Sequence, residues 1–271
     1  MSISTPELAV AINAARSAGE LIMRFFRDGC DFRSKNDDPQ ATFNLVTDAD
    51  LKAEYLIADI IRRSYPAHAV LGEELHPGNL RADHLWIVDP IDGTNNFAHQ
   101  IAHFAVSIAY YRAGKAECGV IYNPAREEWY VTARGQGAWF NECRVQVAKT
   151  TRLEEVLVGL GFYYDRGAMM EATLAAIRDL LRRNIHGTRR MGTASLDLAY
   201  VGTGQFGAYF EYELSPWDFA AGRLFVEEAG GLVTTCAGTP LPLAKTGVLA
   251  SNGPLHPAVL EVVRGHLPAG W

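Results

Sequence analysis

The chain has 271 residues, of which 48% are hydrophobic and 21% are charged, as is typical of a globular protein with a sizeable core. Its formal net charge of −6 argues against nonspecific binding to nucleic acid or to membranes, since both require a basic surface. The four cysteines are far apart and form no CxxC pair, which favours free thiols in a reducing compartment. Because we find neither a signal-peptide pattern nor a long apolar run, we expect a cytoplasmic protein without a membrane span.

Hydrophobic periodicity and turn residues predict the elements in chain order. The first part should contain a helix opened by Ser4-Thr5-Pro6, a polar loop from Lys35 to Asn44, a helix from Thr47 to about Ser64, strands over 69–74 and 85–88, a hairpin over 104–124 and further antiparallel strands over 127–141. From about residue 150 we expect strands over 156–162, 208–213 and 247–251, and helices over 168–183, 192–201, 215–231 and 257–267. This order predicts one domain, 1–271, in which an α+β part (about 1–145) packs tightly against an α/β part (146–271).

Acidic residues gather at the ends of these predicted elements. Glu73 and Glu74 end one strand, Asp89 and Asp92 follow another, and Asp50 and Asp218 lie in the first turns of helices. Each has an ordinary structural interpretation on its own, as an acid that complements a helix dipole, a plain Asp-Gly turn or a solvated strand end. However, the apolar run Trp86-Ile87-Val88 should place Asp89 at the edge of the core, where an unpaired carboxylate is costly. Together the acids indicate a bound cation.

A ligand set made only of oxygen atoms favours a hard cation such as Mg²⁺, which commonly binds carboxylates, water and phosphate oxygens. Directly after Asp92, Gly93 would let an anion approach the backbone, and Thr94, Asn95 and Asn96 would open a short helical turn whose free N–H groups face that anion. Adjoining cation and anion sites predict metal-assisted phosphoester hydrolysis.

At this point the sequence resembles a known family. The segments "GEE", "WIVDPIDGTNNFAH" and "WDFAAGRLFVEEAGG" resemble, in order and separation, the three motifs of the inositol monophosphatase family. The resemblance extends from about residue 7 to residue 265. It implies a layered αβαβα sandwich of the inositol monophosphatase and fructose-bisphosphatase type, dependence on Mg²⁺, sensitivity to Li⁺ and a homodimer.

The resemblance also implies a set of metal ligands. Glu73, Asp89 and the backbone carbonyl of Ile91 would bind a first Mg²⁺, and Asp89, Asp92 and Asp218 a second. Glu73 would help to hold a weaker third ion through water. The loop from Lys35 to Asn44 looks longer than is usual in the family, and it covers the metals in relatives, so third-metal affinity and lithium sensitivity depend on it.

Catalytic and substrate-binding roles follow from the same resemblance. Glu73, together with Thr94 paired to Asp50, would act on the attacking water, and the N–H groups of Gly93 and Thr94 would hold the phosphate. Glu211 would contact substrate hydroxyls, and Glu74 would lie behind the metal ligands. The expected substrate-binding residues are Asp92, Gly93, Thr94, Gly192, Thr193, Ala194, Glu211 and Asp218.

We therefore expect hydrolysis of a small phosphate monoester, foremost inositol 1-phosphate, by in-line attack of a metal-activated water. Histidinol phosphate, NADP(H), fructose 1,6-bisphosphate and a 3′,5′-bisphosphonucleotide remain alternative substrates, and a partner-binding module that keeps the fold is the non-enzymatic alternative. The segment "GTGQFG" matches GxGxxG, but a helix is predicted before it and a strand after it, the reverse of a dinucleotide site. The pair His99 and His103 lacks the HExxH glutamate and should be structural.

Overall fold

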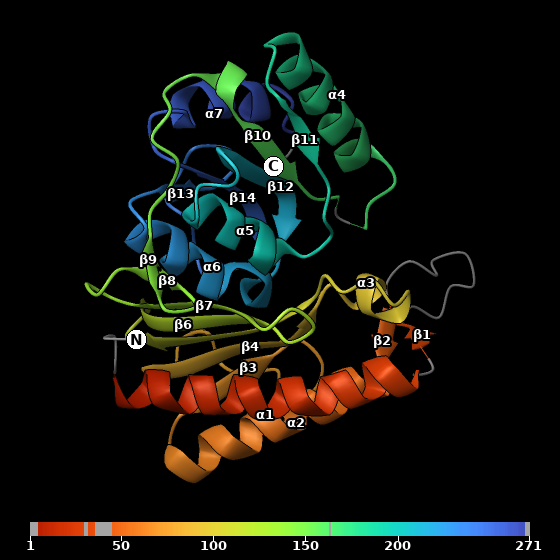
Figure 1. Cartoon of the computed structure of the whole chain (residues 1–271), viewed down its shortest axis with the longest axis vertical. Helices are drawn as coiled ribbons and strands as arrows, with labels where there is room; N and C mark the ends of the chain where they lie inside the picture. Colours follow the sequence, from red (N-terminus) through yellow and green to blue (C-terminus); the bar gives the residue numbers. More distant parts are fainter. Residues whose placement is uncertain (1–4, 30–31, 36–44, 163, 269–271) are drawn as a thin grey trace.

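The computed structural model describes residues 5–29, 32–35, 45–162 and 164–268. Two sheets alternate with three layers of helices, and Figure 1 shows these layers stacked from bottom to top. The predicted αβαβα sandwich is confirmed.

The bottom layer consists of α1 (Pro6–Asp28) and α2 (Asp48–Ser64), which pack against each other and against the first sheet (Figure 1). Thr5 opens α1 because its side chain accepts a hydrogen bond from the N–H of Leu8. Ser4 lies outside the described residues. Thr47 opens α2 through a capping box with Asp50, as predicted. Both helices direct an alanine- and isoleucine-rich stripe into the core.

The first sheet has seven strands in the order β3-β4-β5-β6-β7-β8-β9. Its β3–β4 pair is parallel, and the other pairs are antiparallel. On β4 the side chains alternate, so that Leu85 and Ile87 join the core above the sheet, while Trp86 and Val88 join the core with α1 and α2. The strands are β3 (Ala69–Gly72), β4 (His84–Asp92), β5 (Ala105–Arg112), β6 (Lys115–Asn123), β7 (Glu128–Ala133), β8 (Ala138–Phe140) and β9 (Cys143–Val145).

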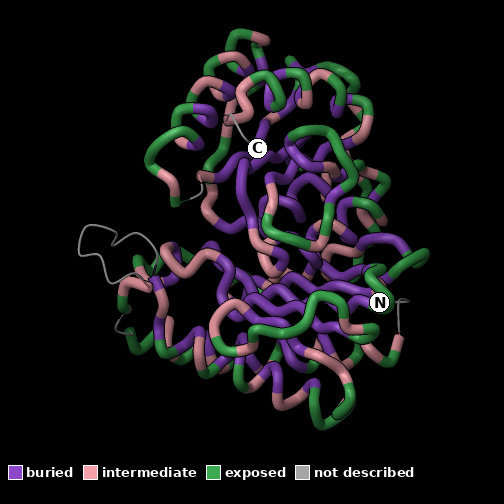
Figure 2. Tube along the Cα trace, turned by 180° about the vertical axis from the view of Figure 1, so that it is seen from behind, coloured by how far each residue is buried: buried purple, intermediate pink, exposed green. Residues whose placement is uncertain are grey.

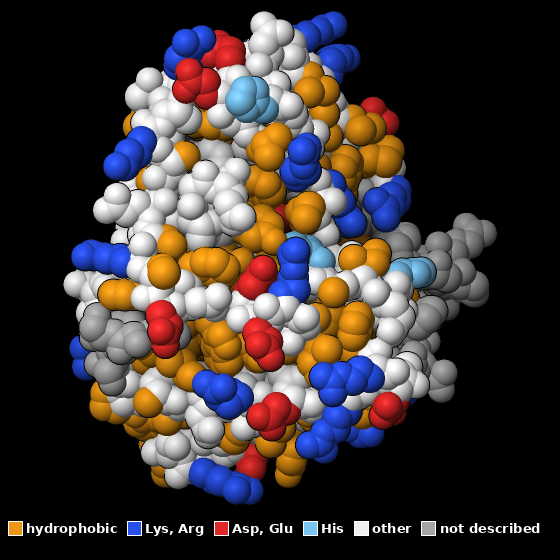
Figure 3. Space-filling view, viewed as in Figure 1, with side chains coloured by type: hydrophobic (Ala, Val, Ile, Leu, Met, Phe, Trp, Pro, Cys, Tyr) orange, Lys and Arg blue, Asp and Glu red, His pale blue; other side chains and the backbone are white. Residues whose placement is uncertain are grey.

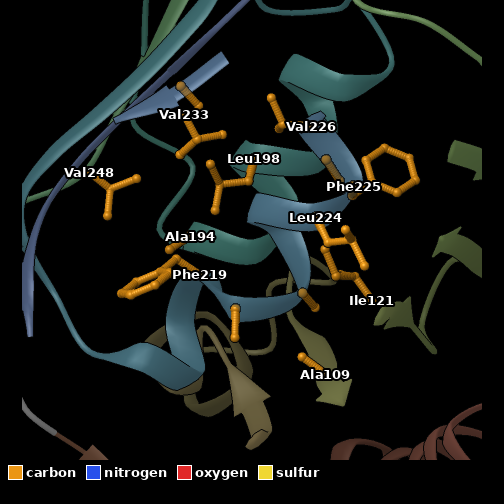
Figure 4. Packing of buried hydrophobic residues seen from close by; sticks show 14 of the residues in the cluster. Ala109, Ile121, Ala194, Leu198, Phe219, Leu224, Phe225, Val226, Val233 and Val248 are labelled. Carbon is orange, nitrogen blue, oxygen red and sulfur yellow. The ribbon is translucent and has the colours of Figure 1, made fainter. Parts of the chain in front are cut away.

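The middle layer consists of α5 (Ala194–Gly202) and α6 (Pro216–Glu228), which lie between the two sheets. Figure 4 shows Leu198 of α5 and Leu224 and Phe225 of α6 in one hydrophobic cluster with Ile121 of β6 and Val248. Because sheets cover these helices on opposite sides, all residues of α5 are buried, and the helix lacks a polar face. The shared cluster holds the two sheets together.

The second sheet has five strands in the order β11-β10-β12-β14-β13, with β10, β11 and β12 parallel and the rest antiparallel. α4 and α7 cover its outer face (Figure 1). The elements are β10 (Leu157–Leu160), α4 (Ala168–Arg182), β11 (Gly187–Arg189), β12 (Ala208–Leu214), β13 (Leu232–Thr234), β14 (Thr246–Ser251) and α7 (His256–Gly265).

Several short elements were not predicted. They are β1 (Phe32–Ser34), β2 (Leu45–Thr47), η1 (Leu153–Glu155), β9, β11 and β13, and each has only three residues, too few for a periodic pattern. The short helix expected after Gly93 is confirmed as α3 (Thr94–Ala98). The strand predicted over 85–88 extends to Asp92. Of the predicted polar loop, residues 36–44 lie outside the described residues.

Buried residues run through both sheets and through the layer between them, as Figure 2 shows from behind. On the face shown in Figure 3, charged side chains of both signs are interspersed with apolar ones. None of the helices in the described residues is both long and apolar enough to cross a membrane. The single domain with parts of about 1–145 and 146–271 stays a prediction.

Candidate active site

A bulge in β4 brings Asp89 and Asp92 to one face of the first sheet. Asp89 lies opposite Ser107 of β5, and Asp92 lies opposite Ala105, so one residue of β5 faces two residues of β4. In a regular strand, residues three apart point to opposite faces, but residues opposite Ala105 and Ser107 share a face. The Ser107 hydroxyl donates a hydrogen bond to the carbonyl of Trp217 at the start of α6. Both aspartates therefore face α6.

Asp218 meets them from the first turn of α6. Its Oδ2 accepts a hydrogen bond of 2.6 Å from the N–H of Ser215, so Asp218 closes the start of the helix on which it lies. Burial, with the charges of Glu73 and Asp92, raises the pKa of Asp218 well above its usual value. Burial, Glu73 and Asp92 also raise the pKa of Asp89. These acids therefore repel one another across the site.

Glu73 and Glu74 follow β3 and share one lysine. The Lys35 ammonium lies 2.6 Å from Glu73 Oε1 and also pairs with Glu74. Burial alone would lower the pKa of Lys35, but the two glutamates outweigh it and raise that pKa. Burial and the Glu73 charge raise the pKa of Glu74 to about 7. Lys35 thus supplies one positive charge at the edge of the acidic cluster.

Thr94, the first residue of α3, links the turn after β4 to α2. Its hydroxyl lies 3.2 Å from Asp50 Oδ1 and 3.0 Å from the carbonyl oxygen of Ile91. Asp50 Oδ2 accepts hydrogen bonds from the N–H and hydroxyl of Thr47. Burial raises the pKa of Asp50 to about 6, although the bonds from Thr47 oppose that rise. Asp50 therefore caps α2 and also orients Thr94.

The turn at Gly93 requires a glycine for two reasons. Its φ is +93°, in the left-handed region that residues with a side chain rarely adopt. A Cβ atom at Gly93 would also lie 2.4 Å from the hydroxyl oxygen of Thr193. The turn that follows Asp92 is therefore packed directly against the loop before α5.

Two side chains join this turn to the second part of the chain. Asp92 Oδ1 and Oδ2 accept hydrogen bonds of 3.2 and 2.6 Å from the N–H groups of Ala194 and Ser195, the first residues of α5. Asn96 donates from Nδ2 to the carbonyls of His103 and Met191. Burial raises the pKa of Asp92 to about 6, and the hydrogen bonds from Ser195 and Ala194 oppose the rise.

Glu211 of β12 forms the far wall of the site. Its Oε2 accepts a hydrogen bond of 2.7 Å from the hydroxyl of Tyr209, and burial raises its pKa to about 7. Gly161 makes room for it, because a Cβ atom there would lie 1.7 Å from Glu211 Oε2. Nearby, Oδ1 of Asp197 is buried without a hydrogen-bond partner among the described residues.

Eleven of the twelve predicted site residues line a single cavity of about 290 Å³, namely Glu73, Asp89, Ile91, Asp92, Gly93, Thr94, Gly192, Thr193, Ala194, Glu211 and Asp218. Asp50 is the exception, since it lies behind Thr94 rather than on the wall. Lys35, Tyr164, Asp197 and Trp217 also line the cavity and were not predicted. Trp217 lies next to Asp218 in the segment "WDFAAGRLFVEEAGG", but that segment alone assigned it no role. The positions of Lys35, Tyr164 and Asp197 depend on packing between distant segments.

The chemistry of the donor set fits a divalent cation. The acidic residues and Ile91, which offer hard carboxylate and carbonyl oxygens, line the cavity, and burial with mutual repulsion raises the pKa values of the aspartates. As the side chains stand, no three His, Cys, Asp or Glu within the described ranges form a group that could hold a metal ion. Glu73 instead pairs with Lys35, and Asp92 and Asp218 bond backbone N–H groups. Because a carboxylate offers about four acceptor sites, these contacts leave lone pairs that a cation could bind.

Comparisons with known proteins agree with this geometry. The sequence profile of the inositol monophosphatase family matches residues 4–267. The Nus factor SuhB of Pseudomonas aeruginosa is 41% identical over 268 residues, which cover 97% of both chains. The solved IMPase of Thermotoga maritima superposes with a TM-score of 0.87 at 33% identity, covering 97% of this chain and 98% of that one. The inositol monophosphatase of Anabaena superposes with a TM-score of 0.84 at 36% identity, with the same coverage. The chain belongs to the inositol monophosphatase family.

Proposed function

We propose that the protein is a Mg²⁺-dependent phosphate monoester hydrolase, with inositol 1-phosphate as its foremost substrate. The observation that carries this proposal is the bulge in β4, which directs Asp89 and Asp92 toward Asp218 across one cavity. Family membership and the similarity to solved IMPases support a phosphatase. The buried acids need positive charge, and the donor set suits a hard cation.

Glu73, Asp89, Asp92, Asp218 and the carbonyl of Ile91 are the groups that would hold two or three Mg²⁺ ions. The ions would supply positive charge to the phosphate and lower the pKa of a bound water. Without that charge, the repulsion among Asp89, Asp92 and Asp218 would be balanced only in part by Lys35.

The chain's own groups would place the reacting water and the phosphate. At pH 7 Asp50, with a pKa of about 6, is largely ionised and accepts the hydrogen of the Thr94 hydroxyl. The Thr94 oxygen is then free to accept a hydrogen bond from the attacking water, which would turn a water lone pair toward phosphorus. The left-handed turn at Gly93 would let the N–H groups of Gly93 and Thr94 approach the phosphate oxygens.

The alcohol side of the ester would lie against Glu211 and the loop from Gly192 to Ala194. Tyr209 holds one oxygen of Glu211, so the other would accept substrate hydroxyls. This wall suits a polyol, but it does not distinguish inositol 1-phosphate from histidinol phosphate, NADP(H), fructose 1,6-bisphosphate or a 3′,5′-bisphosphonucleotide. These remain the alternatives.

A panel of these phosphate esters, assayed with Mg²⁺ and again with EDTA, tests the proposal. We expect phosphate release that requires Mg²⁺ and is fastest with inositol 1-phosphate, and inhibition by Li⁺ in a parallel series. If another ester were hydrolysed faster, that ester would take the place of inositol 1-phosphate as the proposed substrate, and the proposed reaction would stand. Absence of Mg²⁺-dependent release from every ester would refute the reaction itself.

A partner-binding role is the second candidate, and the name Nus factor, which the Pseudomonas aeruginosa relative bears, favours it. All four acids proposed as metal ligands line the cavity, and this favours hydrolysis as well. A stoichiometric protein partner, found together with no hydrolysis of any ester in Mg²⁺, would favour binding alone. The predicted homodimer, cytoplasmic location and absence of a nucleic-acid ligand stay predictions.

A further inference from the structure

Glu54 is a fully buried carboxylate on α2 that has no place in the proposed chemistry. Its Oε2 accepts a hydrogen bond of 2.7 Å from the N–H of Glu74. Its Oε1 accepts bonds of 2.8 and 2.9 Å from the N–H groups of Leu75 and His76. His76 Nδ1 also lies 2.8 Å from the same oxygen. Three consecutive amides and one ring thus close around one side chain.

The end of β3 is shaped to admit this carboxylate. A Cβ atom at Gly72 would lie 2.2 Å from Glu54 Oε1 and 2.3 Å from its carboxyl carbon. No side chain therefore fits at Gly72 while Glu54 keeps this position. The Glu54 carboxylate therefore lies against Gly72, the residue that precedes Glu73.

Asp50 and Glu54 are four residues apart on α2, so they project from the same face of the helix. Asp50 contacts Thr94 in the turn after β4, while Glu54 holds the backbone that follows β3. One rigid helix thus fixes the positions of the two segments that supply Thr94 and Glu73 to the cavity.

We propose that Glu54 is a positioning residue that holds the backbone after β3, and with it Glu73, toward the cavity and thereby sets the affinity for the divalent cation. This inference rests on the proposed function. Residues that orient metal ligands by hydrogen bonds commonly change metal affinity about 10–100-fold when they are replaced. The competing interpretations are that Glu54 stabilises only the fold, or that it attracts cations by its charge alone.

Two substitutions separate these interpretations. Glu54→Gln keeps the shape, loses the charge and turns an N–H₂ group toward amide donors. Glu54→Asp keeps the charge but withdraws the carboxylate by one methylene. The matched control is Glu228→Gln. Glu228, at the end of α6, also accepts hydrogen bonds from backbone N–H groups, but these belong to Gly135 and Gly137, in a loop away from the cavity.

Mg²⁺ binding to the full-length metal-free proteins is measured by calorimetry, and the unfolding temperature is measured alongside. We expect both Glu54 variants to bind Mg²⁺ about tenfold more weakly. Glu228→Gln should bind Mg²⁺ as tightly as the parent does, even if its unfolding temperature falls as far as those of the Glu54 variants. Unchanged affinity in the Glu54 variants, or a loss in Glu54→Gln alone, would overturn the positioning role.

Hydrogen exchange on the parent protein provides a test that does not depend on any variant folding. If the backbone from Glu74 to His76 is coupled to cation binding, Mg²⁺ should slow hydrogen exchange at these three amides. Unchanged exchange would contradict the inference. A parent that binds no Mg²⁺ would refute the proposed function together with this inference. A parent that binds Mg²⁺ as tightly as both Glu54 variants would refute only the role of Glu54.

Discussion

Asp92 accepts a 2.6 Å hydrogen bond from the N–H of Ser195, 103 residues further along the chain. This bond joins the end of β4 in the first sheet to the start of α5 between the sheets. The same carboxylate is a proposed metal ligand, so the arrangement of the two parts and the proposed chemistry depend on one side chain.

Replacement of Gly93 by alanine should destabilise the protein and reduce turnover. The alanine would have to adopt a φ of +93° and would collide with the Thr193 hydroxyl, and we expect a loss of about 1–3 kcal/mol in the free energy of unfolding. Gly114→Ala is the control, because Gly114 also has a positive φ, +74°, but nothing lies within 4 Å of its Cβ position. Denaturant unfolding should give a smaller loss there, about 1–2 kcal/mol, from backbone strain alone. Equal losses would show that the contact with Thr193 is unimportant.

Thr94 is expected to act through its hydroxyl. Thr94→Val removes the group that contacts Asp50 and should lower kcat about 100-fold with little change in KM. Thr94→Ser retains a hydroxyl, and its kcat should stay within about tenfold of the parent. Steady-state kinetics with saturating Mg²⁺ measure both. If Thr94→Val kept the parental kcat, Thr94 would have no part in orienting the water.

Glu211 should distinguish esters by their hydroxyl groups. At about pH 8, where Glu211 with its pKa of about 7 is mostly ionised, Glu211→Gln should raise KM for inositol 1-phosphate by about tenfold or more, since a hydrogen bond to a charged group is lost. KM for p-nitrophenyl phosphate, which has no hydroxyls, should not change. Glu213→Gln, two residues further along β12, is the matched control, because Glu213 is as buried but pairs with Lys245 outside the cavity. A uniform rise in KM for both esters would contradict the proposed role.

The stability gain from Mg²⁺ should be larger at about pH 8 than at about pH 5. Burial raises the pKa of Asp50 and Asp92 to about 6 and that of Glu211 to about 7. A carboxyl with a higher pKa in the folded than in the unfolded chain holds its proton more tightly when folded. The metal-free protein therefore loses stability as the pH rises from about 4 to about 7, and a bound cation should offset that loss.

Thermal unfolding with and without EDTA at the two pH values measures this difference. Burial lowers the pKa of His103 to about 4, so this group destabilises the folded protein as the pH falls below about 6.5. His103 acts in both the EDTA and the Mg²⁺ samples, and its effect cancels in the difference. If the stability gain from Mg²⁺ were equal at both pH values, the carboxyls with raised pKa values would not be linked to cation binding.

The sequence predicts the positions of the acids well, because they lie at the ends of elements with strong apolar patterns. The local structure around these acids is indicated directly by the capping box of Thr47 and Asp50, by the strand before Asp89 and by the glycine after Asp92. The bulge in β4 is different. Period-2 alternation places Asp89 and Asp92 on opposite faces, and only the pairing with β5 shows that they share one.

Side chains that act across long separations could not be predicted. Lys35 is a single lysine at the start of a polar loop, and its role depends on the position of Glu73, 38 residues later. Glu54 looks like an ordinary polar residue of an amphipathic helix, yet it is fully buried under the segment from Glu74 to His76. Such contacts depend on tertiary packing, which local propensity does not encode.

The most direct test of the account compares phosphate release from inositol 1-phosphate by the parent and by Asp92→Asn in saturating Mg²⁺. The amide keeps the shape and one acceptor for the α5 N–H groups, but it removes the charge that would hold the cation. We predict a folded variant whose kcat is lower by about 1,000-fold, while Asp59→Asn, a half-buried aspartate on α2 paired with Arg63, keeps the parental rate. Parental turnover by the folded Asp92→Asn variant would contradict the proposed metal site.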